Sequence, residues 1–400
     1  LRAIYMYLMN KYTSRIPVIS DPEDAFTAAH ACLEKHYTYD IAKPWLGGGL
    51  ITADVPTWKA HRKIINLAFT QQVLNGLLCV FNSQSRQLLQ PFDENIGQTF
   101  NPEPVLLTNN LTTICKTSLA VDTIEHKEIF DEYVNSTRAI FAVMFERFLK
   151  YWLHSDFIYY FSSLKRRQDK ILKGLHKLSD TVISISMTIV GPPLMDTILE
   201  SVDKGLLTDR QVREHLDTII FGGHDTSATT LTYTLVLLGS DQKRQEKLFK
   251  EITEVMGDSH RDVEKEDLPK LMYLEYVIKE SLRLYPIAPL FPRVATTNMK
   301  LSTLQTVHRH SIWGLDAEEF RPERWQEPDS LPDVHKVFGA FGVGRRNCIG
   351  KPYAIMSMKV TLVYLLRRYR VTADISKLTL KMDSLLRPNS GHDITVELRT

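Results

Sequence analysis

A single cysteine lies in a glycine-rich loop directly in front of a helix, and this loop constrains the fold more than any other segment. The loop reads FGVGRRNCIG from Phe341 to Gly350, and helical spacing of apolar residues begins just behind Cys348. The first turn of a helix has unpaired N–H groups and positive potential, which stabilise a thiolate. A buried structural cysteine is the alternative. Glycines that let amides approach the sulfur, together with Arg345 and Arg346, favour a metal-binding or reactive thiol.

The composition excludes several classes of protein. Of the 400 residues, 44% are hydrophobic and 24% charged, which is typical of a globular chain rather than a disordered one. Lys and Arg number 49 against 47 Asp and Glu, so a nucleic-acid binder that works by bulk charge is disfavoured. The four cysteines form no CxxC pair, so we expect a reducing compartment and no disulfide framework.

Hydrophobic periodicity predicts a mostly helical chain. Residues Thr208 to Gln211 form a capping box, from which a helix of about 45–50 Å is expected to reach Gly239. Ser240 is expected to cap the next helix, which would end at Gly257. Further helices are predicted from residue 22 and over 57–78, 130–190, 271–284 and 350–369, with strands over 4–9, 15–20, about 290–305, 377–382 and 393–398. The pattern favours a mainly α fold with small β-sheets (α+β), as one domain over residues 1–400.

The cysteine loop resembles a known motif. Its residues fit the pattern F-x-x-G-x-R-x-C-x-G, which resembles the haem-binding loop of cytochrome P450 enzymes. The resemblance implies the cytochrome P450 fold, with a long central helix over haem b and Cys348 as the axial thiolate ligand of the iron. It also implies that Phe341 shields the sulfur, that Arg346 donates to a haem propionate and that Gly350 belongs to the cofactor loop.

An E-x-x-R pair and a later arginine fit the same family. Glu280 and Arg283 lie three residues apart on the predicted helix 271–284, and FRPERW follows with Arg324. Taken alone, such an ion pair is common on solvated helix faces. In the family these three side chains lock together and hold the loop beneath the haem, which is a structural role.

The middle of the long helix carries the string GGHDTS, from Gly222 to Ser227. Glycine costs roughly 1 kcal/mol against alanine inside a helix, so a compensating reason is expected. A simple helix kink is one alternative. The resemblance implies instead a groove for dioxygen, in which Asp225 and Thr226 are the acid–alcohol pair that delivers protons. The Thr226 hydroxyl can also bond the carbonyl four residues earlier.

Three further residues match the family's propionate contacts. Trp58 and Arg62 lie one turn apart on the predicted helix 57–78 and both can donate to a carboxylate. Arg293 follows the E-x-x-R helix, and the resemblance implies that it is a second arginine donor beside Arg346. A plain helix surface is the alternative for the Trp58–Arg62 pair.

Within the family, the chain resembles the microsomal family-4-like group, judged by KPWLGGGLITA, GHDTS and DLPKLMYLEYVIKESLRLYP. That group has an N-terminal membrane anchor and a proline-rich hinge, so the sequence as it stands is expected to be a fragment. Many members carry a haem-esterified glutamate where Gly222 stands, so non-covalent haem is expected. Between Lys300 and His308 the chain is shorter than the pattern by about one β-hairpin.

The resemblance predicts a haem-thiolate monooxygenase that inserts one atom of O₂ into an apolar substrate such as a fatty acid, a related lipid or a xenobiotic. The implied partners are NADPH-cytochrome P450 reductase, cytochrome b5 as a further candidate, and the cytoplasmic face of the endoplasmic reticulum membrane, with no nucleic acid. Several basic residues near the loop could form a docking face for an acidic electron-donor protein, and a plain solvated face is the alternative. They are Lys59, Arg62, Lys63, Arg345 and Lys351. The alternatives are a haem-binding pseudoenzyme, inactive because of the missing hairpin, and a reductase-independent isomerase or dehydratase, which the Asp225–Thr226 pair disfavours.

Overall fold

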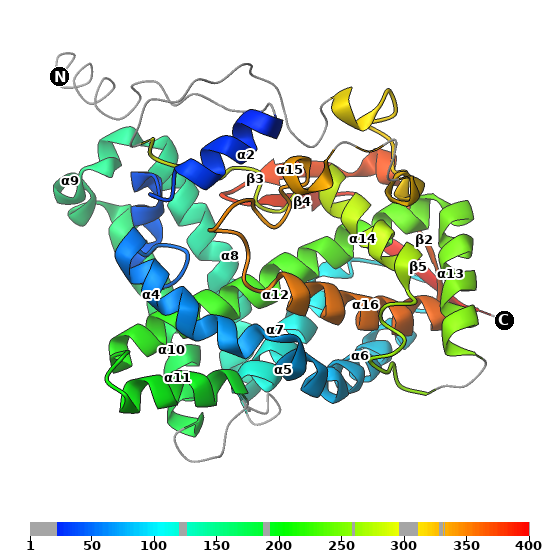
Figure 1. The fold of residues 1–400 in the computed structure, drawn as a ribbon, viewed down its shortest axis with the longest axis horizontal. Helices are drawn as coiled ribbons and strands as arrows, with labels where there is room; N and C mark the ends of the chain where they lie inside the picture. The colour runs from blue at the N-terminus through cyan, green and yellow to red at the C-terminus, as the bar shows by residue number, and fades with distance from the viewer. Residues whose placement is uncertain are drawn as a thin grey trace.

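The computed structural model describes residues 22–119, 126–186, 193–257, 261–295, 311–327, 331 and 333–399. Helices dominate this part of the chain, as predicted (Figure 1). The α-helices are α2 (Pro22–Ala31), α3 (Lys43–Leu46), α4 (Val55–Ile65), α5 (Gln71–Gly76), α6 (Leu78–Asp93), α7 (Glu103–Leu119), α8 (Lys127–Leu149), α9 (Asp156–Tyr160), α10 (Ser163–Ser186), α11 (Pro193–Asp203), α12 (Asp209–Ser240), α13 (Gln242–Met256), α14 (Met272–Leu284), α15 (Val334–Val337) and α16 (Lys351–Arg368).

Two small antiparallel sheets complete the described fold. One has the strand order β1 (Thr99–Phe100), β5 (Ile394–Leu398), β2 (Tyr369–Thr372), and the other is the hairpin of β3 (Thr379–Met382) and β4 (Leu386–Ser390). The predicted mainly α fold with small sheets is therefore confirmed. Strands β3 and β5 were predicted to within two residues. Strands β1, β2 and β4 were not predicted, because they lack a long alternation of apolar and polar residues.

The predicted long helix is α12, which crosses the centre of the molecule beside α16 (Figure 1). Its capping box forms as expected: the Gln211 N–H donates to the Thr208 hydroxyl, and the Thr208 N–H donates to the Gln211 side chain. Almost every residue from His215 to Gly239 is buried, because α3, α7, α10, α14 and α16 all pack against this helix. A helix enclosed in this way has no solvated face, so its buried threonines donate to carbonyls four residues earlier, as Thr229, Thr232 and Thr234 do.

Two predicted helix boundaries are wrong. Asp241, and not Ser240, caps α13 by accepting from the Arg244 N–H at 3.0 Å, while Ser240 is the last residue of α12. The predicted helix 57–78 is divided, because Thr70 is extended and separates a 3-10 turn from α5. The apolar spacing continues through this break, so periodicity alone could not reveal it.

Some predictions lie outside the described residues. These are the strands at 4–9 and 15–20, most of the segment 290–305, and the shortened region between Lys300 and His308. The prediction of one domain over residues 1–400 stays a prediction. Within the part of the chain that the structure describes, no helix has the length and apolarity needed to cross a bilayer.

Candidate haem site

The cysteine loop is a tight turn in front of α16, as predicted. The Cys348 N–H donates to the Phe341 carbonyl at 2.7 Å and closes the loop. Gly342 and Gly344 have φ angles of 70° and 73°, in the left-handed region that favours glycine. A Cβ on Gly344 would also lie 2.6 Å from the Ala29 carbonyl oxygen of α2. The glycines therefore fix the loop conformation and let it approach a neighbouring helix.

Cys348 lies directly in front of α16. The pKa of its thiol is raised, because burial outweighs the lowering by the Gly350 N–H, the charge of Arg62 and the Lys351 N–H. The residue as a whole is nevertheless exposed. A cation bound to the sulfur would deprotonate the thiol. Gly350 lies beside the sulfur, because a Cβ added to it would be 3.9 Å from Sγ.

Helix α4 is attached to this loop. The Arg62 guanidinium donates to the Asn347 carbonyl at 2.8 Å and to the Asn347 side chain at 3.1 Å. Trp58, one turn earlier, packs under Arg346, whose guanidinium carbon is 4.5 Å from the indole centroid. The structure thus brings Trp58, Arg62 and Arg346 to one place beside Cys348. Phe341 is half-buried against the core at the start of the loop.

A cluster of cations adjoins Trp58. Burial and the charge of Arg293 lower the pKa of Arg346 to about 10. Burial and the charges of Arg293 and Arg346 lower the pKa of Lys35 well below its usual value. Lys35 pairs with Arg293 through an isolated antiparallel bridge and lies 4.0 Å from the Tyr39 ring centroid. Nη1 of Arg346 and Nε of Arg293 are buried without hydrogen-bond partners.

Arg346 is buried, while Lys35 and Arg293 are half-buried, and an anion stabilises such a cluster of cations and unpartnered N–H donors. Two carboxylates of a haem would satisfy them, so the residues present fit the group that the loop motif implies. Sequence reasoning found Arg293 and Arg346 but missed Lys35 and Tyr39. No sequence pattern could have marked Lys35 and Tyr39 as site residues. They join the cluster only because residues 34–36 pair with residues 292–294, which are far away in the sequence.

An opening lies midway along α12. Gly222, Gly223 and Thr226 are half-buried, whereas the neighbouring residues of this helix segment are buried. The Thr226 hydroxyl donates to the Gly222 carbonyl at 2.6 Å, the bond expected from the sequence. A Cβ on Gly223 would lie 2.7 Å from Ile114 of α7, whereas one on Gly222 would meet nothing within 4 Å. Gly223 is therefore required by packing, and Gly222 leaves space.

Asp225 points away from this opening. Its side chain is buried, and Oδ1 is 2.8 Å from the Arg387 guanidinium of β4. Its other oxygen, Oδ2, has no hydrogen-bond partner. Successive residues on a helix do not face each other, so the carboxylate and the Thr226 hydroxyl are neighbours in sequence without a direct contact. Sequence reasoning missed Arg387, which no motif marks.

The predicted lock of Glu280, Arg283 and Arg324 is confirmed. Arg283 donates to both carboxylate oxygens of Glu280 at 2.9 Å, and Arg324 donates to one of them at 2.9 Å. The Trp325 indole N–H adds a bond at 3.0 Å. All three charged side chains are at most 2% exposed. The lock joins α14 to the segment 313–325 that precedes the cysteine loop.

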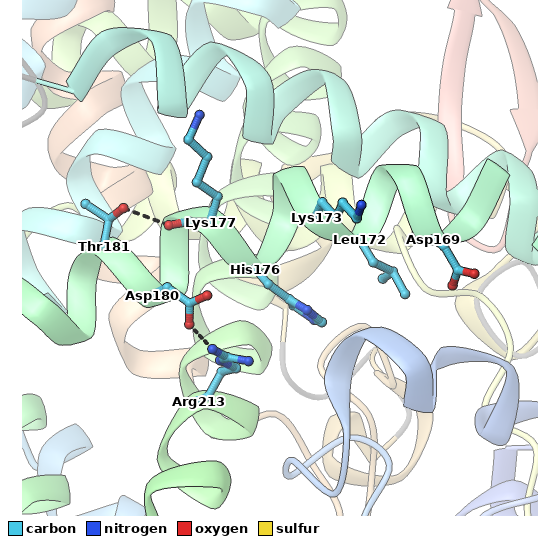
Figure 2. Close-up of a pocket in the computed structure, with 8 residues that line it drawn as sticks. All are labelled: Asp169, Leu172, Lys173, His176, Lys177, Asp180, Thr181 and Arg213. Atoms are coloured by element: carbon cyan, nitrogen blue, oxygen red, sulfur yellow. Dashed lines mark hydrogen bonds and ion pairs between the residues drawn. The ribbon is translucent and has the colours of Figure 1, made fainter. Parts of the chain in front are cut away.

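A surface groove of about 520 Å³ lies elsewhere, between α10 and the first turns of α12 (Figure 2). Its residues are Asp169, Leu172, Lys173, His176, Lys177, Asp180, Thr181 and Arg213. Asp180 and Arg213 form an ion pair across one end. None of the residues predicted from the motifs lines this groove, so it is not the candidate site.

Comparisons with known proteins identify the family of this chain. The sequence model of the family "Cytochrome P450" matches residues 5–396. Cytochrome P450 4V2 of Rattus norvegicus is 31% identical over 403 residues, which cover 92% of this chain and 77% of the relative. Cytochrome P450 4V2 of Homo sapiens is 28% identical over 436 residues (99% and 83%), and cytochrome P450 4c3 of Drosophila melanogaster is 28% identical over 410 (92% and 76%). The chain belongs to the cytochrome P450 family of monooxygenases.

Proposed function

We propose that this chain is a haem-thiolate monooxygenase in which Cys348 is the only protein ligand of the haem iron. The observation that carries the proposal is the place of Cys348 directly in front of α16, in a loop that its own N–H closes on the Phe341 carbonyl at 2.7 Å. When bound, a thiolate-ligated haem supplies the redox chemistry that activates dioxygen, while the protein supplies binding, orientation and protons. Trp58, Arg62, Arg293 and Arg346 would hold the propionates.

The experiment is a reduced, carbon-monoxide-bound difference spectrum, whose red-shifted Soret band reports a thiolate on the iron. Cys348→Ala should abolish this band. Cys79→Ala, at an exposed cysteine, and Cys115→Ala, at a buried one, are the matched controls and should keep it. An unchanged spectrum from Cys348→Ala would overturn the proposal.

The haem is proposed to be haem b, held without a covalent bond. Gly222 stands at the opening of α12 and offers no carboxylate for an ester. Chromatography under denaturing conditions should separate the haem from the polypeptide completely. Haem that stays with the chain would show that another residue forms a covalent link.

Proton delivery is assigned to Asp225 and Thr226. The Thr226 hydroxyl is at the opening and donates to the Gly222 carbonyl, which leaves its oxygen able to accept a hydrogen bond from a proton donor. To pass its own proton on, the hydroxyl rotates away from that carbonyl and takes up the donor's proton in its place. Asp225 is the adjacent acid, with one oxygen free of hydrogen bonds. Ordered water would have to join the two groups, since they do not touch.

The proposed substrate is apolar: a fatty acid, a related lipid or a xenobiotic. Phe221, next to Gly222, packs in a buried aromatic cluster with Trp45 and Phe141, at ring-centroid distances of 5.1 and 5.3 Å. Such a cluster beside the opening favours apolar molecules. Turnover of candidate substrates would separate this enzyme from the pseudoenzyme alternative.

The proposed electron donor is NADPH-cytochrome P450 reductase, with cytochrome b5 as a further partner. Lys59, Lys63, Arg345 and Lys351 are exposed around the cysteine loop, and Arg62 ties α4 to that loop. A basic face of this kind attracts an acidic protein. Reductase affinity should therefore weaken with salt and with substitution of these lysines.

Contact with the cytoplasmic face of the endoplasmic reticulum membrane is also proposed. Large side chains are exposed around α9, at the edge of the molecule (Figure 1). They are Phe148, Leu149, Trp152, Phe157, Ile158, Tyr160 and Phe161. Aromatic residues of this kind favour a lipid interface. Vesicle binding that is lost on replacing Phe157 and Phe161 by serine would support this location.

A further inference from the structure

Arg387 of β4 contacts Asp225 of α12 and is almost completely buried. Its guanidinium is 2.8 Å from Asp225 Oδ1 and 3.4 Å from Asp383 Oδ1, at 3% exposure of its side chain. Its guanidinium carbon also lies 4.9 Å from the Phe141 ring centroid. The C-terminal hairpin therefore contributes a charged group to the segment of α12 proposed to deliver protons.

The cluster has two carboxylates and one guanidinium. A buried carboxylate without a cation is costly and takes up a proton instead. Burial raises the pKa of Asp383, and the charge of Arg387 opposes this effect. Asp383 is also closer to water, with 18% of its side chain exposed, and lies 3.6 Å from the exposed Lys381. Arg387 is therefore paired both with Asp225, which is fully buried, and with Asp383, which lies near the surface.

We propose that Arg387 is a positioning residue for Asp225: the guanidinium is the counter-charge of the buried carboxylate and lies at Oδ1, so that Oδ2 is the oxygen that takes up a proton. The contact is an ion pair, since the three guanidinium nitrogens have no hydrogen-bond partner among the described residues. An arginine cannot pass a proton on, because its guanidinium stays charged. Its effect therefore acts through Asp225. This inference rests on the proposed role of Asp225 in proton delivery, and it adds a residue that the α12 motif does not contain.

The first test reads ionisation directly, by infrared spectroscopy of the haem-loaded protein at neutral pH. It uses an Asp383→Asn background, in which Asp225 is the one carboxylate of the described residues that stays paired with Arg387. Adding Arg387→Met should produce the carbonyl band of a protonated carboxylic acid, and adding Asp225→Asn as well should remove it. If Arg387→Met produces no carboxylic-acid band, or if the band remains after Asp225→Asn, the inference is wrong.

The second test measures product formed per NADPH consumed. Arg387→Met should lose coupling to the same extent as Asp225→Asn, and the double variant should be no worse than either, since both substitutions remove one function. Arg387→Lys should restore part of the coupling. If Arg387→Met does not fold, Arg387→Gln removes the charge more conservatively and takes its place.

The control is Arg399→Met, at an arginine whose side chain is 6% exposed and pairs with Glu246 at 2.9 Å beside the other sheet. It should change stability and leave coupling intact. Full coupling in Arg387→Met, alongside uncoupling by Asp225→Asn, would overturn the inference and leave the proposed function standing. Full coupling in Asp225→Asn would instead overturn the proton role of Asp225, and this inference with it.

Discussion

His61 of α4 and His215 of α12 meet across the interface of their helices, with Nδ1 of His61 2.9 Å from Nε2 of His215. The rings cross at 81° and both residues are buried. One ring must donate and the other accept, so the bond requires at least one neutral histidine. Burial, followed by the nearby His61, lowers the pKa of His215 to about 3. This neutral pair fixes the helix that carries Trp58 and Arg62 onto α12.

The pair predicts acid lability. In the unfolded chain His215 has its ordinary pKa of about 6.5, so the unfolded state binds the extra proton first as the pH falls. Stability is therefore complete above about pH 6.5 and is lost as the pH falls towards 3. At pH 5 the loss from this residue is about 2 kcal/mol, at 1.4 kcal/mol per pKa unit.

Denaturant unfolding at pH 7.5 and pH 5 measures the effect. The difference in the free energy of unfolding between the two pH values should be smaller in His215→Gln than in the unchanged protein. His335→Gln, at an exposed histidine, is the control and should behave like the unchanged protein. An equal pH difference in all three proteins would contradict the prediction.

Features set by neighbouring residues were predicted from the sequence, whereas contacts between distant segments were not. The start of α12, the cysteine loop and the Glu280–Arg283 pair were predicted, because capping residues, glycines and i,i+3 spacing act within a few residues. The partners Lys35 and Arg387 were not. Lys35 reaches Arg293, and Arg387 reaches Asp225, only after distant segments pair. Hydrophobic periodicity gives no information on such contacts. From the sequence alone, an arginine on a short strand is expected to be a surface residue, and only the fold shows that Arg387 is buried.

Breaking the lock around Glu280 should be severely destabilising. Glu280→Gln removes the carboxylate that Arg283 and Arg324 share, while Arg324 keeps its pair with Asp316 at 3.1 Å. Removing one partner of a buried ion pair costs about 3–5 kcal/mol. The measurement is the free energy of unfolding by denaturant. Glu254→Gln, at an exposed pair with Lys250, is the control and should cost less than about 1 kcal/mol. Similar losses in both variants would show that burial does not set the cost.

Lys35 should have opposite effects on the protein with and without haem. Without an anion, Lys35→Met relieves repulsion from Arg293 and Arg346, so the haem-free protein should melt at a higher temperature. With haem, it removes a hydrogen bond to a charged group worth about 1.5–3 kcal/mol, so haem affinity should fall roughly tenfold or more. Haem titration and thermal melts of both forms measure this. Lys170→Met, at an exposed lysine of α10, should change neither, and unchanged haem affinity in Lys35→Met would remove Lys35 from the site.

Thr226→Ala should uncouple the reaction. The threonine hydroxyl stands at the only half-buried stretch of α12 between His215 and Gly239, so its loss removes a proton-carrying group where the helix is open. Loss of such a group typically costs on the order of 10²-fold. NADPH should still be consumed, with hydrogen peroxide released in place of product.

Thr234→Ala is the matched control, because Thr234 also donates to the carbonyl four residues earlier, at 2.8 Å, but is completely buried. Product per NADPH should be unchanged in that variant. If Thr226→Ala couples as well as Thr234→Ala does, the Thr226 hydroxyl serves only the helix, and the protons must reach the site by another group.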